Sequence, residues 1–127
     1  MTAYKQQLGA AGEKAAVQFL VNNNYKILDV NYRCRFGEID IIARDAQYTV
    51  FIEVKTRKNV MYGLPAEAVN YHKQRKILKV AQQYMLYKKR FDDDIRFDVV
   101  EVIAQMQQHA PISIQKIRLI KNAFQMA

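Results

Sequence analysis

The most constraining feature of the sequence is a pair of adjacent β-rich runs at residues 38–44 and 48–56. Only the short polar segment DAQ separates them, so we expect the two runs to pair as an antiparallel hairpin. The hairpin is rich in isoleucine, valine and phenylalanine, yet it carries Asp40 in its first run and Glu53 and Lys55 in its second. Because charged groups are costly to bury without a partner, these three side chains need either partners or a function.

The rest of the chain surrounds the hairpin with helical and strand patterns. Apolar residues recur at helical spacing over residues 4–22, and a second helix is expected over about 66–89. Further strands are expected over 25–33, 96–104 and 112–120. The order α-β-β-β-α-β-β predicts an α/β fold with a central mixed sheet flanked by helices. Half of the 127 residues are hydrophobic, which is enough to build one globular domain from residues 1–127.

The strand period brings the charges of the hairpin together. Alternate residues of a strand share a face, so Glu53 and Lys55 point the same way and Asp40 can approach Glu53 across the hairpin. Neighbouring carboxylates repel each other, and a divalent cation such as Mg²⁺, or Mn²⁺ in its place, removes the conflict. Lys55 could then orient a water or balance the charge of a phosphate. A buried salt bridge between Lys55 and one acid, or a strand with one polar face, also explains the pattern.

A third acid lies on the first helix. Glu13 lies at the edge of the apolar face of this helix. Its neighbours one turn away are small or apolar residues that cannot pair with it. Small neighbours allow another element to approach closely. We therefore expect Glu13 to reach the acidic pair, Asp40 and Glu53, with a capping or solvated role as the alternative.

The chain is strongly basic, with a formal net charge of +8. Half of its 20 lysines and arginines lie between residues 55 and 90, where the only acid is Glu67. This charge favours a polyanionic partner, nucleic acid before an anionic membrane surface, and a solvated lysine-rich face is the alternative. The residues expected to contact nucleic acid are Arg33, Arg35, Arg57, Lys73, Arg75, Lys76 and Lys79. Lys73 falls near the apolar edge of its helix, so it could point toward the acidic pair instead.

Two further features bear on location. The single cysteine, Cys34, cannot form an internal disulfide, which favours a reducing, cytoplasmic setting. No apolar run approaches the roughly 20 residues that span a bilayer, so no membrane partner is expected.

Taken together, the motifs resemble a known nuclease core. A helix carrying Glu13, followed by GEID and EVK, resembles the catalytic core of the PD-(D/E)XK nuclease superfamily. The sequence is closer still to the YraN-like family of small bacterial proteins, which is similar to archaeal Holliday-junction resolvases. That resemblance covers nearly the whole chain and rests on GEKAA at 12–16, NYR at 31–33, GEIDIIA at 37–43, FIEVKTR at 51–57, YGLP at 62–65, RFDVV at 96–100 and KNAF at 121–124.

The resemblance implies a restriction-endonuclease-like core and a metal-dependent site. It implies that Asp40 and Glu53 bind the metal, together with the carbonyl of Val54. It also implies a catalytic role for Lys55 and a supporting role for the acid Glu13.

The leading hypothesis is a Mg²⁺-dependent endonuclease that acts on DNA, including branched DNA in repair or recombination. A homodimer is expected by analogy, because a resolvase must cut two strands. One alternative is a non-catalytic nucleic-acid-binding module that positions a partner enzyme. Another is a protein-interaction domain in which the acids and the lysine form a buried salt-bridge network.

Overall fold

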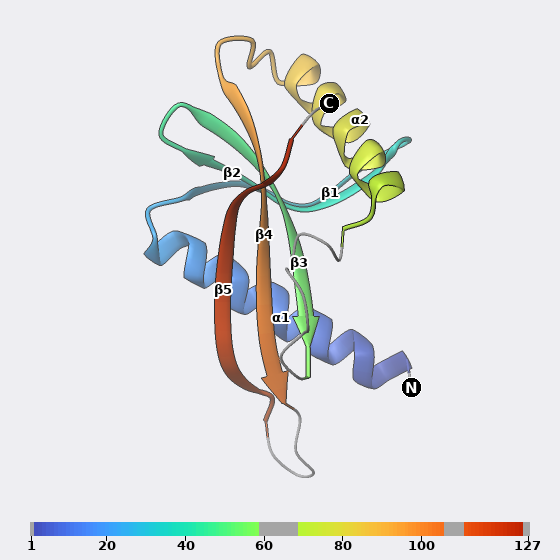
Figure 1. The fold of residues 1–127 in the computed structure, drawn as a ribbon, viewed down its shortest axis with the longest axis vertical. Coiled ribbons are helices and arrows are strands. Elements are labelled where there is room, and N and C mark those ends of the chain that lie inside the picture. The colour runs from blue at the N-terminus through green and yellow to red at the C-terminus, as the bar shows by residue number, and fades with distance from the viewer. Residues whose placement is uncertain (1, 59–68, 106–110, 126–127) are drawn as a thin grey trace.

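The computed structural model describes residues 2–58, 69–105 and 111–125 of the chain. Within these ranges the predicted elements are all present, in the predicted order (Figure 1). They are α1 (Thr2–Asn22), β1 (Lys26–Cys34), β2 (Gly37–Asp45), β3 (Tyr48–Arg57), α2 (Tyr71–Tyr87), β4 (Asp94–Gln105) and β5 (Ser113–Phe124). Neither described helix is long and apolar enough to cross a membrane.

The strands form one five-stranded sheet in the order β1-β2-β3-β4-β5. β1, β2 and β3 pair antiparallel in sequence, β4 runs parallel to β3, and β5 returns antiparallel to β4. A parallel pair needs a crossover connection, and α2 lies in the segment that joins β3 to β4. The fold is therefore α/β with a mixed sheet and two helices, as predicted, and it is consistent with a restriction-endonuclease-like core.

Each helix covers one face of the sheet, and each face has its own apolar core. α1 packs mainly on β3 and β4, where Leu20, Ile52 and Val100 are fully buried. α2 packs over β2, and its Val80 and Tyr84 are buried in the second core. The side chains of β4 alternate between the two cores, as a strand period of two requires.

The two strands of the hairpin separate partway along their length. β2 and β3 are paired from their turn as far as Ile41 and Ile52, whereas β3 stays beside β4 to Arg57. Figure 1 shows β1 and β2 curving toward α2, while β3, β4 and β5 continue over α1. We call this separation the fork. Asp40 and Glu53 are the first residues beyond the last pair, so each stands on one branch of it.

The second helix is shorter than predicted. Residues 69–70 and 88–89, which the prediction included, are not helical. Asn70 is the N-cap: its backbone is extended, and its side chain accepts from the N–H of Lys73 at 2.9 Å. Lys89 has a φ of 55°, a left-handed conformation that ends a helix. The YGLP segment lies outside the described residues.

Candidate active site

The backbone at the fork fixes the position of Asp40. Beyond Ile41, β2 no longer pairs with β3, and the N–H of Val54 donates to Oδ2 of Asp40 at 2.8 Å. The carboxylate thus takes the place of a strand carbonyl, which a buried backbone N–H requires as a partner. Asp40 is therefore held across the fork against β3.

Glu53 is the best-buried charged group at the fork, with 7% of its surface exposed. Its Oε1 accepts from Nζ of Lys73, which reaches it from the first turn of α2. Nζ of Lys55 lies 3.8 Å from the same oxygen. The structure therefore brings three of the predicted site residues together, Asp40, Glu53 and Lys55, and adds Lys73 to them.

The surroundings of Asp40 oppose its ionisation. Burial raises the pKa of Asp40 to about 7, and the negative charge of Glu53 contributes to the rise. The N–H of Val54 lowers the pKa, Glu13 raises it, and Lys73 lowers it. The carboxylate repulsion that the sequence led us to expect is therefore one cause of the rise, after burial. Near neutral pH a proton and a cation would compete for Asp40.

The two lysines differ although they share one carboxylate. Burial, and then the positive charge of Lys73, lower the pKa of Lys55. Burial also acts to lower the pKa of Lys73, but its hydrogen bond to Glu53 and the charge of Glu53 outweigh that effect and raise it. Lys73 is therefore the firmer ionic partner of Glu53. Lys55 gives up its proton more readily than an ordinary lysine does.

α1 brings Glu13 toward the fork. Its neighbour Gly12 packs so closely on Thr56 of β3 that a Cβ at Gly12 would lie 1.9 Å from the Thr56 hydroxyl oxygen. The expected close approach of a second element therefore occurs: β3 contacts α1 at Gly12, the residue before Glu13. Glu13 is half-buried and raises the pKa of Asp40 by its charge. Even so, no three His, Cys, Asp or Glu side chains of the described chain converge on one metal-sized site.

The predicted basic face is present on α2. Arg75, Lys76 and Lys79 are exposed, and the opposite side of the helix is buried in the core. Nη1 of Arg75 donates to the hydroxyl of Tyr71 at 3.1 Å, which holds the guanidinium against the helix. Lys73 does not share this exposed face, because its ammonium points to Glu53.

The three arginines near the strands have different surroundings. Arg33 pairs with Glu38 at 2.9 Å on the exposed surface. The guanidinium of Arg35 lies over the ring of Phe36, 4.8 Å from its centroid. Arg57 follows Lys55 on the same face of β3, and its buried Nε has no hydrogen-bond partner in the described part of the chain. Arg57 therefore extends the positive charge beside the acidic pair.

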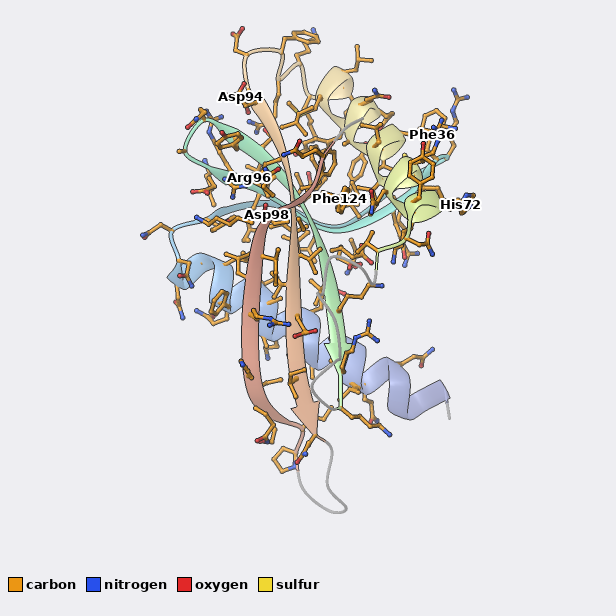
Figure 2. All side chains as sticks on the ribbon, in the orientation of Figure 1. Phe36, His72, Asp94, Arg96, Asp98 and Phe124 are labelled. Carbon is orange, nitrogen blue, oxygen red and sulfur yellow. The ribbon has the colours of Figure 1, made fainter. Side chains whose placement is uncertain are left out.

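Two buried acids of β4 already have partners. Glu101 accepts from Arg118 at 3.0 Å. Asp98 accepts from Arg96 and from the hydroxyl of Tyr25, both at 2.9 Å, and Figure 2 shows Arg96 and Asp98 together on β4. The RFDVV motif therefore contributes a buried ion pair to the fold. Pairing of these two acids with basic residues agrees with the sequence-based expectation, but sequence reasoning could not name Tyr25, which is 73 residues from Asp98.

The sequence matches one protein family over most of its length. The model of the family described as "Uncharacterised protein family UPF0102" matches residues 12–102, a range that begins beside Glu13 and includes the whole fork.

Similar proteins named UPF0102 protein occur in several bacteria. The relative from Clostridium kluyveri is 46% identical over 125 residues, which cover 98% of this chain and 99% of the relative. The relative from Acetivibrio thermocellus is 50% identical over 121 residues, covering 94% and 92%. The relative from Clostridium tetani is 47% identical over 126 residues, covering 99% and 100%.

Proposed function

The chain belongs to the UPF0102 family. We propose that it is a Mg²⁺-dependent endonuclease that acts on DNA and has its active site at the fork between β2 and β3. The observation that carries the proposal is the meeting of two carboxylates, Asp40 and Glu53, with the ammonium of Lys55. Both lysines converge on Glu53, and within the described residues Asp40 accepts only a backbone N–H.

The donor atoms at the fork suit a hard divalent cation. Asp40 and Glu53 would hold Mg²⁺ together with the carbonyl of Val54, and waters and a substrate phosphate would complete the shell. Two carboxylates are sufficient, because Mg²⁺ is commonly held by one or two of them. When bound, the ion would polarise the phosphodiester and make a bound water more acidic.

Lys55 is the residue that we assign to the attacking water. Its lowered pKa favours an amine that can accept a proton. As the water oxygen bonds to phosphorus, its proton passes to Nζ of Lys55, the bond from phosphorus to the leaving oxygen breaks, and that oxygen takes a proton from solvent. Glu13 would orient a second water from the α1 side.

The basic face of α2 would hold the DNA backbone beside the fork. Arg75, Lys76 and Lys79 are exposed cations on the helix whose first turn reaches Glu53. Phosphate contacts of this kind give affinity without sequence preference. That suits a substrate defined by shape, such as branched DNA, and cutting both strands of a branch would require a homodimer.

One observation favours a second function, a non-catalytic nucleic-acid-binding module. Lys73 already neutralises Glu53, so the fork can be stable without a metal while the basic face binds DNA. Such a module would bind DNA equally well with and without divalent cations.

Cleavage assays with matched variants separate the two functions. Branched, duplex and single-stranded DNA would be incubated with Mg²⁺ or Mn²⁺ and with wild type, Asp40→Asn, Lys55→Met or Glu38→Gln. Glu38 is an exposed acid two residues from Asp40 on β2, so Glu38→Gln is the control. We expect wild type and Glu38→Gln to cleave and the two fork variants to be inactive. Equal cleavage by all four proteins, or by none, would contradict the proposed enzyme.

A further inference from the structure

Lys73 stands where the acidic pair would bind a cation. Its Nζ donates to Oε1 of Glu53, and its positive charge also acts on Asp40. The backbone of Lys73 is anchored, because its N–H donates to the N-cap side chain of Asn70 at 2.9 Å. The side chain is much more exposed than its partner: 41% of it is accessible to solvent, against 8% for Glu53.

Two lysines already lie beside the acidic pair. The two carboxylates of the acidic pair face two ammonium groups, Lys55 and Lys73, so they are balanced within the chain. Both lysines contact Oε1 of Glu53, so a divalent ion that binds this oxygen must compete with them. Lys73 is the firmer ionic partner of Glu53, but it is also the lysine with room to leave, because it is more exposed and lies on α2, whereas Lys55 is on β3 two residues from Glu53.

We propose that Lys73 is an internal counter-ion that keeps the acidic pair neutral, and that a divalent cation displaces it toward the substrate phosphate. This inference rests on the proposed metal site. Because the backbone of Lys73 stays capped, its released ammonium remains within one side-chain length of Glu53, where the phosphate of the substrate would lie. Metal binding and DNA binding are then coupled through one residue, and each strengthens the other.

Calorimetric titration with Mn²⁺ alone tests the competition without any catalysis. Wild type, Lys73→Met and Lys76→Met would be titrated at pH 8. Lys76 is an exposed lysine of the same helix, so it controls for the loss of one positive charge from α2. We expect Lys73→Met to bind Mn²⁺ about tenfold more tightly than the other two, because no hydrogen bond to a charged group has to be broken.

The outcomes of this titration distinguish two failures. If Lys73→Met and wild type bind Mn²⁺ with equal affinity, Lys73 is not a competitor, although the metal site stands. If none of the three proteins binds Mn²⁺ at millimolar concentration, both the proposed metal site and the proposed counter-ion role of Lys73 are refuted.

DNA affinity tests the second half of the proposal. A Lys55→Met background would prevent cleavage, and the dissociation constant of a DNA duplex would be measured with and without Mn²⁺. We expect Mn²⁺ to strengthen binding severalfold in Lys55→Met and much less in the Lys55→Met/Lys73→Met double variant. An equal gain in both would overturn the transfer of Lys73 to phosphate.

Discussion

The close packing of α1 on β3 gives a sharp test of the geometry that delivers Glu13. In Gly12→Ala the new Cβ would lie 1.9 Å from Oγ1, 2.8 Å from Cγ2 and 2.9 Å from Cβ of Thr56. Rotating the Thr56 side chain only exchanges one clashing atom for another, and its Cβ cannot move away. The helix backbone must therefore shift, and such backbone shifts are part of the cost of overpacking a core.

Two opposing effects set the size of the change. Replacing glycine by alanine in a helix gains about 1 kcal/mol, whereas overpacking costs about 1–3 kcal/mol and occasionally more. We expect Gly12→Ala to lower the free energy of unfolding by about 0–2 kcal/mol in balance. Gly9 is the matched control, since a Cβ there meets no atom within 4 Å. Gly9→Ala should be stabilised by about 0.5–1 kcal/mol.

Urea denaturation of both variants would measure the difference, with the slope of the transition as a check that the same surface is exposed. A double-mutant cycle with Thr56→Ala adds a second criterion. Removing Oγ1 and Cγ2 of Thr56 relieves two of the three clashes, so Gly12→Ala should be less harmful in that background. If Gly12→Ala proves as stable as Gly9→Ala, α1 does not contact β3 at this residue, and the placement of Glu13 is wrong.

Four further outcomes follow from the fork and the sheet. Because burial raises the pKa of Asp40 from 3.8 to about 7, the native state holds a proton that the unfolded chain has released in that interval. The free energy of unfolding contributed by this group should then fall as pH rises from 3.8 to about 7. Urea denaturation at pH 5 and 8 should show this fall for wild type and not for Asp40→Asn. Lys55→Met should lower kcat on DNA by a factor of about 10²–10⁴ with little change in the Kd of DNA, measured by single-turnover kinetics. Lys76→Met should reduce the slope of log K against log salt by about 0.9, and an unchanged slope would remove Lys76 from the interface. Asp98→Ala should lower the unfolding free energy by about 1–3 kcal/mol, because Arg96, the hydroxyl of Tyr25 and the N–H of Asn122 lose a buried acceptor, although Arg96 keeps Asp45. The exposed Asp94→Ala on the same strand should change it by less than about 0.5 kcal/mol.

The parts of the fold that depend on local pattern were predictable. Apolar alternation and the DAQ turn specify the hairpin without any distant contact, and the helical stripe likewise specifies α1. The start of α2 was placed too early because proline at position 65 favours a first turn, whereas the structure uses Asn70, which caps by its own side chain. The first residue of α2 is therefore determined by the residue that caps the helix, which the sequence pattern did not identify.

The arrangement of the site residues was predictable where they lie on one strand, because the strand period fixes which side chains share a face. It was less predictable where a side chain comes from another helix or strand. Glu53 and Lys55 share a face because they are two residues apart on one strand. The place of Lys73 near the apolar edge of its helix allowed it to point toward the acidic pair, and the structure confirms this. Helical spacing could not say which acid it meets, since Glu53 is 20 residues away on β3. Glu13 was found through its small neighbours, although the contact that places it belongs to Gly12.

The fork explains why an apolar hairpin carries charges at its centre. Where β2 and β3 stop pairing, the N–H of Val54 loses its strand acceptor, and leaving such a group buried without a partner costs about 1–3 kcal/mol. A leucine at position 40 would leave that donor empty, whereas the carboxylate of Asp40 accepts from it at 2.8 Å. The side-chain oxygen of an asparagine would also accept from this N–H, more weakly because it carries no charge. Asp40→Asn therefore separates the two roles of this residue: it should keep the fork intact and abolish metal binding, while Asp40→Leu should lose both.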